Sequence, residues 1–351
     1  MAELIWKGKE HVHGRQTEDL LHPESIAGPA HHHLVTNTYH LPQEPCEEST
    51  AWFNRLIWGD RHEVLPALLE DFTETIDLIY IDPPFMTGRT FSKGEGIAYS
   101  DTWNNDLDAY LQWLYETLLM LHALLAPDGS LYIHLDWRTV HYAKIMLDEI
   151  FTSHTDLRGG GFKNEIIWHY RSGGRAQHYY ARKHDTLLLY TKSAHYCFHS
   201  ERVSARRGLH KRNHMRKEVG ENGQITWTIR SAGRVYSYNE NTLVALSDVW
   251  SDISHLHQKD PERMGYATQK PEALLERVIL ASSEENDLVL DCFCGSGVTP
   301  LVAERLKRRW IAGDQSAVAI KTIHERLLSH SRVYPFAVQH IAEARQASRN
   351  E

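Results

Sequence analysis

Apolar positions along the chain follow two alternating patterns, short continuous runs typical of buried strands and longer stretches with helical spacing. The run at 76–81 is followed by two prolines, as expected where a buried strand ends. Leucines then recur three and four residues apart across 107–125, which predicts a helix, and a strand at 131–135 and a helix at 140–150 follow. This alternation predicts a parallel sheet covered by helices on both faces.

The alternation is interrupted in the middle of the chain and then resumes. After strands expected at 165–168 and 185–190, the stretch 193–258 is irregular and basic, with strand-like pieces such as 224–229. Beyond it, the pattern predicts helices at 271–282, 299–308 and 317–328 and strands at 288–290 and 310–312. The expected divisions are a loosely ordered N-terminal arm (1–50), a first half of the main domain (51–192), an insert (193–258), a second half (259–332) and a C-terminal tail (333–351).

Positive charge is concentrated in the insert and in the segment before it, although the chain as a whole is acidic. The 351 residues carry a net charge of −8, which by itself argues against a nucleic-acid partner. Residues 158–217, however, hold fourteen Lys or Arg and three acidic residues, a net charge of +11, interleaved with Trp and Tyr. A solvated surface is the ordinary explanation for such a run. Phosphate neutralisation combined with base stacking is the other, and it also accounts for the aromatic residues.

Composition excludes several classes of protein. No run approaches the roughly 18 apolar residues that a membrane span needs, and the N-terminus lacks the apolar core of a signal peptide. The four cysteines do not form a disulfide framework, so we expect a reducing, cytoplasmic environment. The triple histidine at 31–33 and the Cys292-x-Cys294 pair lack partner ligands at metal-binding spacing, so we expect no metal site.

Two junctions between a strand and the following loop hold the candidate chemistry. In the first, the strand at 288–290 leads into Asp291-Cys-Phe-Cys-Gly295-Ser-Gly297 and then into a helix. The two glycines let the backbone pass close to a ligand, and Asp314 follows the next strand, where an acid can hold ribose hydroxyls. Position 300 is Pro instead of the third glycine of dinucleotide sites, which favours a nucleoside cofactor without a pyrophosphate.

The second junction is Asp82-Pro83-Pro84-Phe85, directly after the strand at 76–81. Taken alone, these residues form a stiff turn. The Asp82 carboxylate and the Pro83 carbonyl can also both accept hydrogen bonds from one exocyclic amino group, while Phe85 offers a face on which a heterocycle stacks. Two such acceptors would hold the nitrogen in line with an electrophilic methyl group. A base in a duplex reaches such a pocket only by flipping out of the stack.

With these residues the sequence resembles the S-adenosylmethionine-dependent DNA amino-methyltransferases. Residues 82–85 look like the family's catalytic tetrad and 291–297 like its cofactor loop. The resemblance covers most of 52–330, except the variable stretch near 195–245, and it extends to the segments 56–60, 184–186, 190–192 and 268–271. The catalytic motif comes first, the basic region second and the cofactor loop last, which is similar to the permuted order of the family's β group.

The resemblance implies a fold and a set of cofactor contacts. The fold is α/β, a Rossmann-like, seven-stranded, mostly parallel methyltransferase sheet in permuted order, with a target recognition domain as the insert. Asp314 would take the ribose hydroxyls of S-adenosyl-L-methionine, and Asp60 would approach its adenine. The full set of implied cofactor residues is Asp60, Gln269, Lys270, Asp291, Phe293, Gly295, Gly297 and Asp314, with Gln269 and Lys270 near the cofactor's carboxylate.

The resemblance also narrows the substrate. Family members with Ser at the first tetrad position mostly modify cytosine, so Asp82 favours adenine N6 as the acceptor and leaves cytosine N4 as the alternative. Phe85 replaces the more frequent Tyr and Cys292 a frequent Pro, but a Phe still stacks. Methylation of RNA or of protein glutamine is opposed by Asp82 and by the motif order. A DNA-binding protein that has lost catalysis is opposed by the complete set of cofactor residues.

The implied partner is double-stranded DNA. Trp227, Arg230, Arg234 and Tyr236 fit DNA contact and core packing equally well. The resemblance also allows a homodimer and a cognate restriction enzyme, and we expect the protein in the cytoplasm, associated with the nucleoid. The basic residues expected to contact DNA are Arg171, Arg175, Arg182, Lys183, Arg206, Arg207, Lys211 and Arg212.

Overall fold

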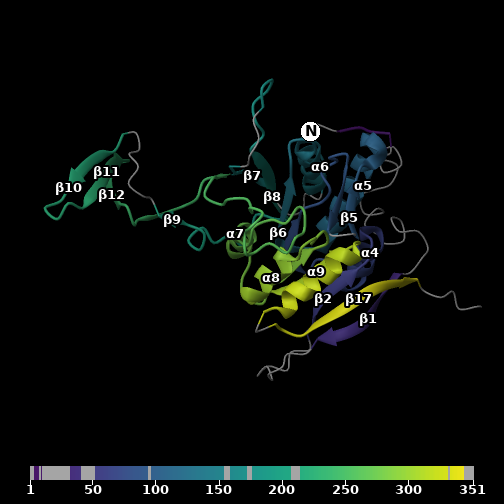
Figure 1. Cartoon of the computed structure of the whole chain (residues 1–351). Coiled ribbons are helices and arrows are strands. Elements are labelled where there is room, and N and C mark those ends of the chain that lie inside the picture. The colour runs from purple at the N-terminus through teal and green to yellow at the C-terminus, as the bar shows by residue number, and fades with distance from the viewer. Residues whose placement is uncertain are drawn as a thin grey trace, which may run out of the picture.

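A large mixed sheet forms the centre of the molecule. The computed structural model describes residues 4–7, 9, 32–40, 52–93, 96–153, 159–171, 176–206, 214–330 and 333–343. The sheet strands are β1 (His32–His40), β2 (Asn54–Trp58), β3 (Ile76–Ile81), β6 (Leu125–Leu135), β7 (Gly161–His169), β8 (His184–Thr191), β14 (Val249–Trp250), β15 (Leu288–Asp291), β16 (Arg309–Asp314) and β17 (Phe336–Glu343). Their order is β1-β17-β2-β16-β15-β3-β6-β8-β7-β14 (Figure 1).

The central part of this sheet confirms the expected Rossmann-like fold. The seven neighbouring strands from β2 to β7 are parallel to one another except for β8, which is antiparallel to both of its neighbours. β3 and β15 are adjacent, with Leu78 opposite Val289 and Ile79 opposite Leu290. The two junctions that lie about 200 residues apart in the sequence therefore leave the sheet at the same edge, side by side.

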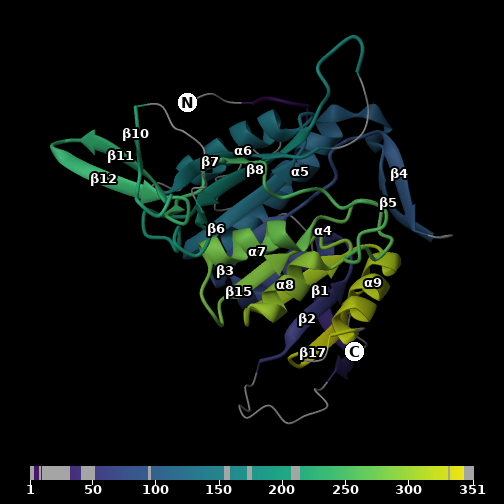
Figure 2. The ribbon, with the colours of Figure 1, turned by 60° about the vertical axis from the view of Figure 1, so that its left-hand side comes forward.

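Six helices cover the two faces of the sheet, as the alternating pattern predicts. In β3, Ile79 and Ile81 point into one core and Leu78 and Tyr80 into the other, because successive side chains of a strand face opposite sides. The first core is closed by α4 (Arg61–Phe72), α5 (Leu107–Leu124) and α6 (Val140–Ser153). The second is closed by α7 (Glu272–Ser282), α8 (Val298–Arg305) and α9 (Ala317–Leu328), which lie together in Figure 2. None of the helices in the described ranges is long and apolar enough to cross a membrane.

The insert forms a small separate sheet that projects from the body of the molecule (Figure 1). Trp227 is 4% exposed and Tyr236 is 42% exposed, so Trp227 packs inside the insert, whereas Tyr236, Arg230 and Arg234 lie on its surface. The strands of this small sheet are β10 (Arg216–Val219), β11 (Ile225–Ser231) and β12 (Arg234–Asn239). A separate two-stranded ribbon is formed by β9 (Ala205–Arg206) and β13 (Leu243–Val244).

The arm and the tail are partly structured, which corrects the expectation of a loosely ordered arm at 32–40. These residues form β1, which pairs antiparallel with β17 of the C-terminal tail, and β17 in turn pairs with β2. β1 covers the edge that β17 would otherwise expose, and Leu34 packs against the core. Trp6 is also buried, in edge-on contact with Tyr115. The remaining domain boundaries stay predictions.

Candidate active site

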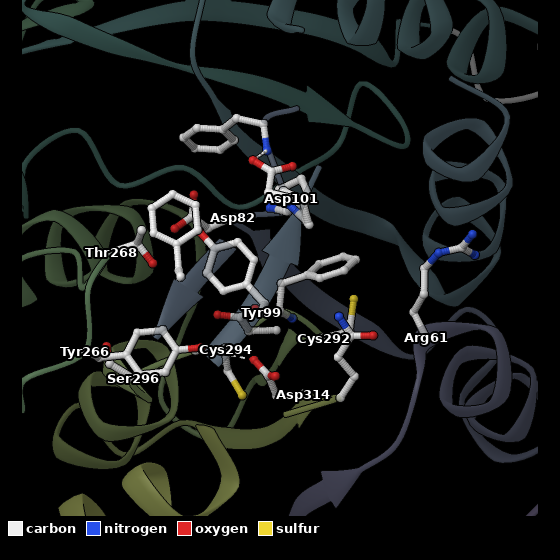
Figure 3. A pocket seen from close by; sticks show the side chains of 18 of the residues that line it. Arg61, Asp82, Tyr99, Asp101, Tyr266, Thr268, Cys292, Cys294, Ser296 and Asp314 are labelled. Atoms are coloured by element: carbon white, nitrogen blue, oxygen red, sulfur yellow. Dashed lines mark hydrogen bonds between the residues drawn. The ribbon is translucent and has the colours of Figure 1, made fainter. Parts of the chain in front are cut away.

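The two junctions meet beside a cavity of about 510 Å³ (Figure 3). The tetrad 82–85 lines one side of this cavity, and Asp291, Phe293 and Gly295 line another, together with Asp60, Lys270 and Asp314. Gln269 and Gly297 do not line it. The Gln269 amide instead accepts from Met264 N and donates to the Glu262 carbonyl, so it holds the loop that precedes α7.

Two hydrogen-bond acceptors of the tetrad already receive a donor from the protein, and one does not. Asp82 Oδ2 accepts from Lys270 Nζ at 2.7 Å, whereas Asp82 Oδ1 is buried without a hydrogen-bond partner among the described residues. Tyr110, at the start of α5, donates its hydroxyl to the Pro84 carbonyl at 2.9 Å. Lys270 thus orients Asp82 with one oxygen unpaired, and its expected position beside the cofactor's carboxylate stays a prediction.

Phe85 is held between a cation and a buried ring. Lys270 Nζ lies 5.1 Å from the centre of the Phe85 ring, and His134 stacks against Phe85 at 6.1 Å with 30° between the planes. His134 is completely buried and comes from the end of β6. This packing limits the rotation of Phe85, which lines the cavity.

A hydrogen-bonded network below Phe85 joins three strands of the sheet. His134 Nδ1 lies 2.9 Å from the Tyr80 hydroxyl, and its Nε2 lies 3.3 Å from Asp185 Oδ2. Tyr170 donates to the other Asp185 oxygen at 3.0 Å. Burial alone would raise the pKa of Asp185, but the hydrogen bond and charge of His134 hold that pKa below its ordinary value. Asp185 therefore stays ionised and fixes His134 under the tetrad.

Asp101, at the end of a hairpin formed by β4 (Arg89–Lys93) and β5 (Gly96–Asp101), holds the backbone that follows the tetrad. Its carboxylate accepts from the amides of residues 85, 86 and 87 at 3.3, 2.8 and 2.8 Å, and from the Thr87 hydroxyl at 2.7 Å. Asp101 is 1% exposed. A buried carboxylate with this many donors is well satisfied, so it fixes the direction in which Phe85 leaves the chain.

Two glycines with positive φ angles shape the loop 291–297, and the carboxylates of Asp291 and Asp314 hold it by hydrogen bonds. Gly295 and Gly297 have φ angles of +49° and +78°, and Gly297 begins α8. Gly295 N donates to Asp314 Oδ2 at 2.9 Å, and Asp291 accepts from the Thr299 hydroxyl at 2.6 Å. Burial raises the pKa of Asp291 to about 7 and that of Asp314 to about 6. Carboxylates in such surroundings gain from a cationic or hydroxyl-bearing ligand.

The two cysteines of this loop are structural. Cys292 and Cys294 are 5% and 6% exposed and belong to the cores on opposite faces of the sheet. Burial raises the pKa of both thiols well above the ordinary value, so both stay protonated. Both side chains therefore pack in the interior, one on each side of the sheet.

Comparison with known proteins identifies the scaffold on which this site is built. The family model described as DNA methylase matches residues 76–325, a range that contains both junctions. The chain belongs to the DNA methylase family. The expectation of an S-adenosylmethionine-dependent DNA amino-methyltransferase is thereby confirmed.

Relatives of this DNA methylase include a type II methyltransferase and a DNA adenine methyltransferase. The type II methyltransferase M.HpaI of Haemophilus parainfluenzae is 31% identical over 78% of this chain and 74% of its own length. The DNA adenine methyltransferase YhdJ of Escherichia coli K12 is 28% identical over 78% of this chain and 82% of its own.

Solved structures of other proteins share the fold of this DNA methylase. TTHA0409 of Thermus thermophilus, a DNA modification methylase crystallised with S-adenosyl-L-methionine, matches with a TM-score of 0.52 and 17% identity over 84% of this chain and all of its own. The cytosine-N4-specific PvuII DNA methyltransferase matches with a TM-score of 0.51 and 20% identity, over 78% of this chain and 86% of its own. At these identities the likeness concerns the fold alone.

The basic residues expected to contact DNA are only partly described in this DNA methylase. Arg171 and Arg182 are exposed and Lys183 is half-buried. The Arg182 guanidinium lies 3.6 Å from the centre of the Trp137 ring, on the loop after β6. The backbone of Arg206 forms part of β9, and Arg175, Arg207, Lys211 and Arg212 lie outside the described residues.

Several residues at the cavity were missed by sequence reasoning. Asp101, Tyr99 and Tyr266 come from the β4–β5 hairpin and from the loop before α7, and all three line the cavity (Figure 3). Tyr266 lies against Gly295, and Phe91 stacks on Tyr99 at 4.8 Å. These residues follow no motif quoted from the sequence, and only the folding of the hairpin over the cofactor loop brings them to the site.

Proposed function

We propose that this DNA methylase transfers a methyl group from S-adenosyl-L-methionine to N6 of an adenine flipped out of duplex DNA. The observation that carries the proposal is Asp82 at the cavity, beside Pro83 and Phe85, with its buried Oδ1 left without a hydrogen-bond partner among the described residues. A carboxylate is a stronger acceptor than a hydroxyl for the hydrogens of an exocyclic amino group. The adenine specificity in the name of the relative YhdJ supports the same choice.

Each residue of the tetrad that contacts the base has its own role in the methyl transfer. The target base stacks on Phe85, and its amino group donates one hydrogen bond to Asp82 Oδ1 and one to the Pro83 carbonyl. These bonds draw the nitrogen lone pair out of the ring and direct it into the cavity. The bound cofactor supplies an electrophilic methyl group. Asp82 then accepts the proton that the methylated nitrogen releases and passes it to solvent.

The cavity fits the cofactor through its acids and its close backbone. Asp314, already positioned by Gly295 N, is placed to accept from ribose hydroxyls, and Asp291 is placed to attract the cationic ammonium group. At Gly295 an added Cβ would lie 3.3 Å from Tyr266, which shows how closely loop and aromatic wall approach there. Asp60 begins α4 and lines the same cavity, on the side assigned to the cofactor's adenine.

Mass spectrometry of nucleosides tests the proposal directly. Purified protein incubated with S-adenosyl-L-methionine and unmethylated plasmid should produce N6-methyladenine. Asp82→Asn should reduce the rate by at least about 100-fold, because an amide cannot accept the proton. Asp71→Asn, an exposed aspartate at the end of α4, is the matched control and should retain full activity. N4-methylcytosine as the product, or an active Asp82→Asn protein, would overturn the adenine mechanism.

The same proposal extends to the partners of the enzyme. The net charge of +11 across residues 158–217 and the projecting insert support recognition of duplex DNA through the insert. The type II relatives support a cognate restriction enzyme as a functional partner. The resemblance to the β group supports a homodimer, and a DNA substrate supports a location in the cytoplasm, associated with the nucleoid.

A further inference from the structure

Three metal-ligating side chains meet at the root of the insert, outside the catalytic cavity. Cys197 and His199 follow β8, and Glu284 follows α7, yet their ligand atoms all lie within 4.8 Å of one another. Cys197 Sγ lies 3.1 Å from His199 Nε2, and His199 Nε2 lies 2.7 Å from Glu284 Oε1. A thiol, an imidazole nitrogen and a carboxylate oxygen thus converge on one point.

The groups behind these ligands already hold them in a metal-binding orientation. His199 Nδ1 lies 3.2 Å from Glu201 Oε1, so this carboxylate can orient the imidazole with Nε2 toward Cys197 and Glu284. Arg202 donates to both Glu284 oxygens, at 3.0 Å to Oε1 and 2.8 Å to Oε2, and Oε1 also lies 2.7 Å from His199 Nε2. A histidine backed by a carboxylate, and a liganding carboxylate backed by its own donor, are the usual outer contacts of metal sites.

We propose that Cys197 Sγ, His199 Nε2 and Glu284 Oε1 bind a divalent transition-metal ion of the zinc type, with water as the fourth ligand. Metal–ligand bonds of about 2.0–2.3 Å place tetrahedral ligand atoms roughly 3.3–3.8 Å apart, so the two short distances at His199 Nε2 need to lengthen by about 1 Å or less. The ion would displace the proton between His199 and Glu284 and the proton of the Cys197 thiol, and both protons would pass to solvent. The mixed sulfur, nitrogen and oxygen set favours zinc or cobalt over magnesium and calcium.

The ion would fasten the insert to the cofactor half of the enzyme. His199 N donates to the Ala281 carbonyl at 2.7 Å and Arg202 donates to the Ser283 carbonyl at 3.3 Å, so the root of the insert already lies on the end of α7. A bond from residues 197–199 to Glu284 reinforces this joint. The role of the site is therefore structural, and it does not depend on which base the enzyme methylates.

Cobalt titration of the full-length protein tests the site. Co²⁺ added to metal-free protein should give a thiolate-to-cobalt charge-transfer band that saturates at one equivalent. Cys197→Ser should abolish the band, and Cys46→Ser, the matched control, should keep it. Cys292 and Cys294 are buried and cannot substitute for Cys197. Glu201→Gln should weaken the affinity by roughly 10–100-fold, because it removes only the group behind His199.

Thermal unfolding with Zn²⁺ provides an independent readout. Zn²⁺ should raise the Tm of the wild-type protein and leave that of Cys197→Ser unchanged, because a ligand that binds only the native state stabilises it. Glu284→Gln keeps the size of the side chain and should lose most of the shift. Absence of a thiolate band in the wild type, or an equal band in Cys197→Ser, would overturn the proposal.

Discussion

The two carboxylate oxygens of Asp82 differ in their hydrogen bonding. Lys270 donates to one carboxylate oxygen, the other is buried without a partner among the described residues, and Tyr110 donates to the Pro84 carbonyl. An unpaired buried oxygen is costly in the protein alone, and a donor on the substrate recovers that cost. A ligand with a hydrogen-bond donor within reach of this oxygen would therefore gain from binding beside Asp82.

The buried acids of the cofactor loop predict a pH dependence. Because burial raises the pKa of Asp291 to about 7 and of Asp314 to about 6, both are largely neutral at pH 5.5 and ionised at pH 7.5 or above. Only the ionised forms attract the ammonium group and accept freely from ribose hydroxyls. We expect cofactor affinity, measured by calorimetry, to be about 10–30-fold weaker at pH 5.5 than at pH 7.5.

The control for this pH dependence separates binding from unfolding. A carboxyl whose folded pKa is raised contributes stability below its unfolded pKa, and this contribution is lost as the pH rises through the folded value. These two groups therefore favour the folded protein at pH 5.5, and the loss of affinity there is not caused by their effect on folding. Asp291→Asn should bind weakly at both pH values, and an unchanged pH profile in that variant would contradict the assignment.

Asp101 predicts a positioning effect that is separate from cofactor binding. In Asp101→Asn one acceptor oxygen becomes an NH₂ group that faces the backbone amides of 85–87, so Phe85 shifts. We expect kcat to fall by roughly 10–100-fold, because small displacements of reacting groups are expensive, while cofactor affinity changes less than about 2-fold. Exposed Asp108→Asn is the control. An equal loss of cofactor affinity would instead indicate general unfolding of the hairpin.

Two secondary-structure elements, the β4–β5 hairpin and α8, complete the site at the strand ends. The hairpin reaches from the tetrad to α9, where Lys93 Nζ donates to Thr322 Oγ1 at 2.8 Å, so catalytic and cofactor halves are joined across the cavity. α8 begins at Gly297 in a left-handed conformation and packs directly against Ile323 of α9. The turn into α8 thus sets the position of the whole cofactor loop.

Gly297→Ala tests this helix start. A Cβ at position 297 would lie 2.8 Å from Ile323, and the φ of +78° is unfavourable for alanine. We expect the free energy of unfolding to fall by about 1–3 kcal/mol, measured by denaturant titration. Adding Ile323→Val should recover only part of this loss, because the backbone strain remains. Gly220→Ala, in an exposed turn with ordinary φ, is the control and should cost less than about 0.5 kcal/mol.

The whole molecule consists of a body that holds the cavity and a small sheet that projects from it (Figure 1). Strands β10 to β12 contribute no residue to the two main hydrophobic cores, and β9 pairs with β13 at the point where the chain leaves and re-enters the body. This architecture predicts that catalysis and DNA recognition can be separated by deletion.

The register of the β9–β13 ribbon defines the deletion. Arg206 lies opposite Leu243, so residues 207–242 can be replaced by an Asn-Gly turn that closes a hairpin. We expect the shortened protein to bind S-adenosyl-L-methionine as tightly as the full chain and to methylate duplex DNA at least about 100-fold more slowly. Calorimetry and nucleoside mass spectrometry measure the two effects. Site-specific methylation at the wild-type rate would contradict the role of the insert.

The sequence by itself determined the features that depend on local pattern. Strand and helix periodicity predicted the α/β alternation, and the tetrad 82–85 and the loop 291–297 identified the two ligand-facing junctions before any contact was known. These features were predictable because neighbouring residues alone produce them: an apolar run forms a buried strand, prolines end it, and glycines allow the left-handed turns.

Tertiary structure alone decided which distant side chains act together. The pairing of Lys270 with Asp82, the hold of Asp101 on residues 85–87 and the approach of Glu284 to Cys197 each join elements from separate parts of the chain. Strand β1 belongs to the same class, because its stability comes from pairing with β17 rather than from an apolar pattern of its own. Such contacts are set by the packing of whole elements, so no local stretch of sequence records them.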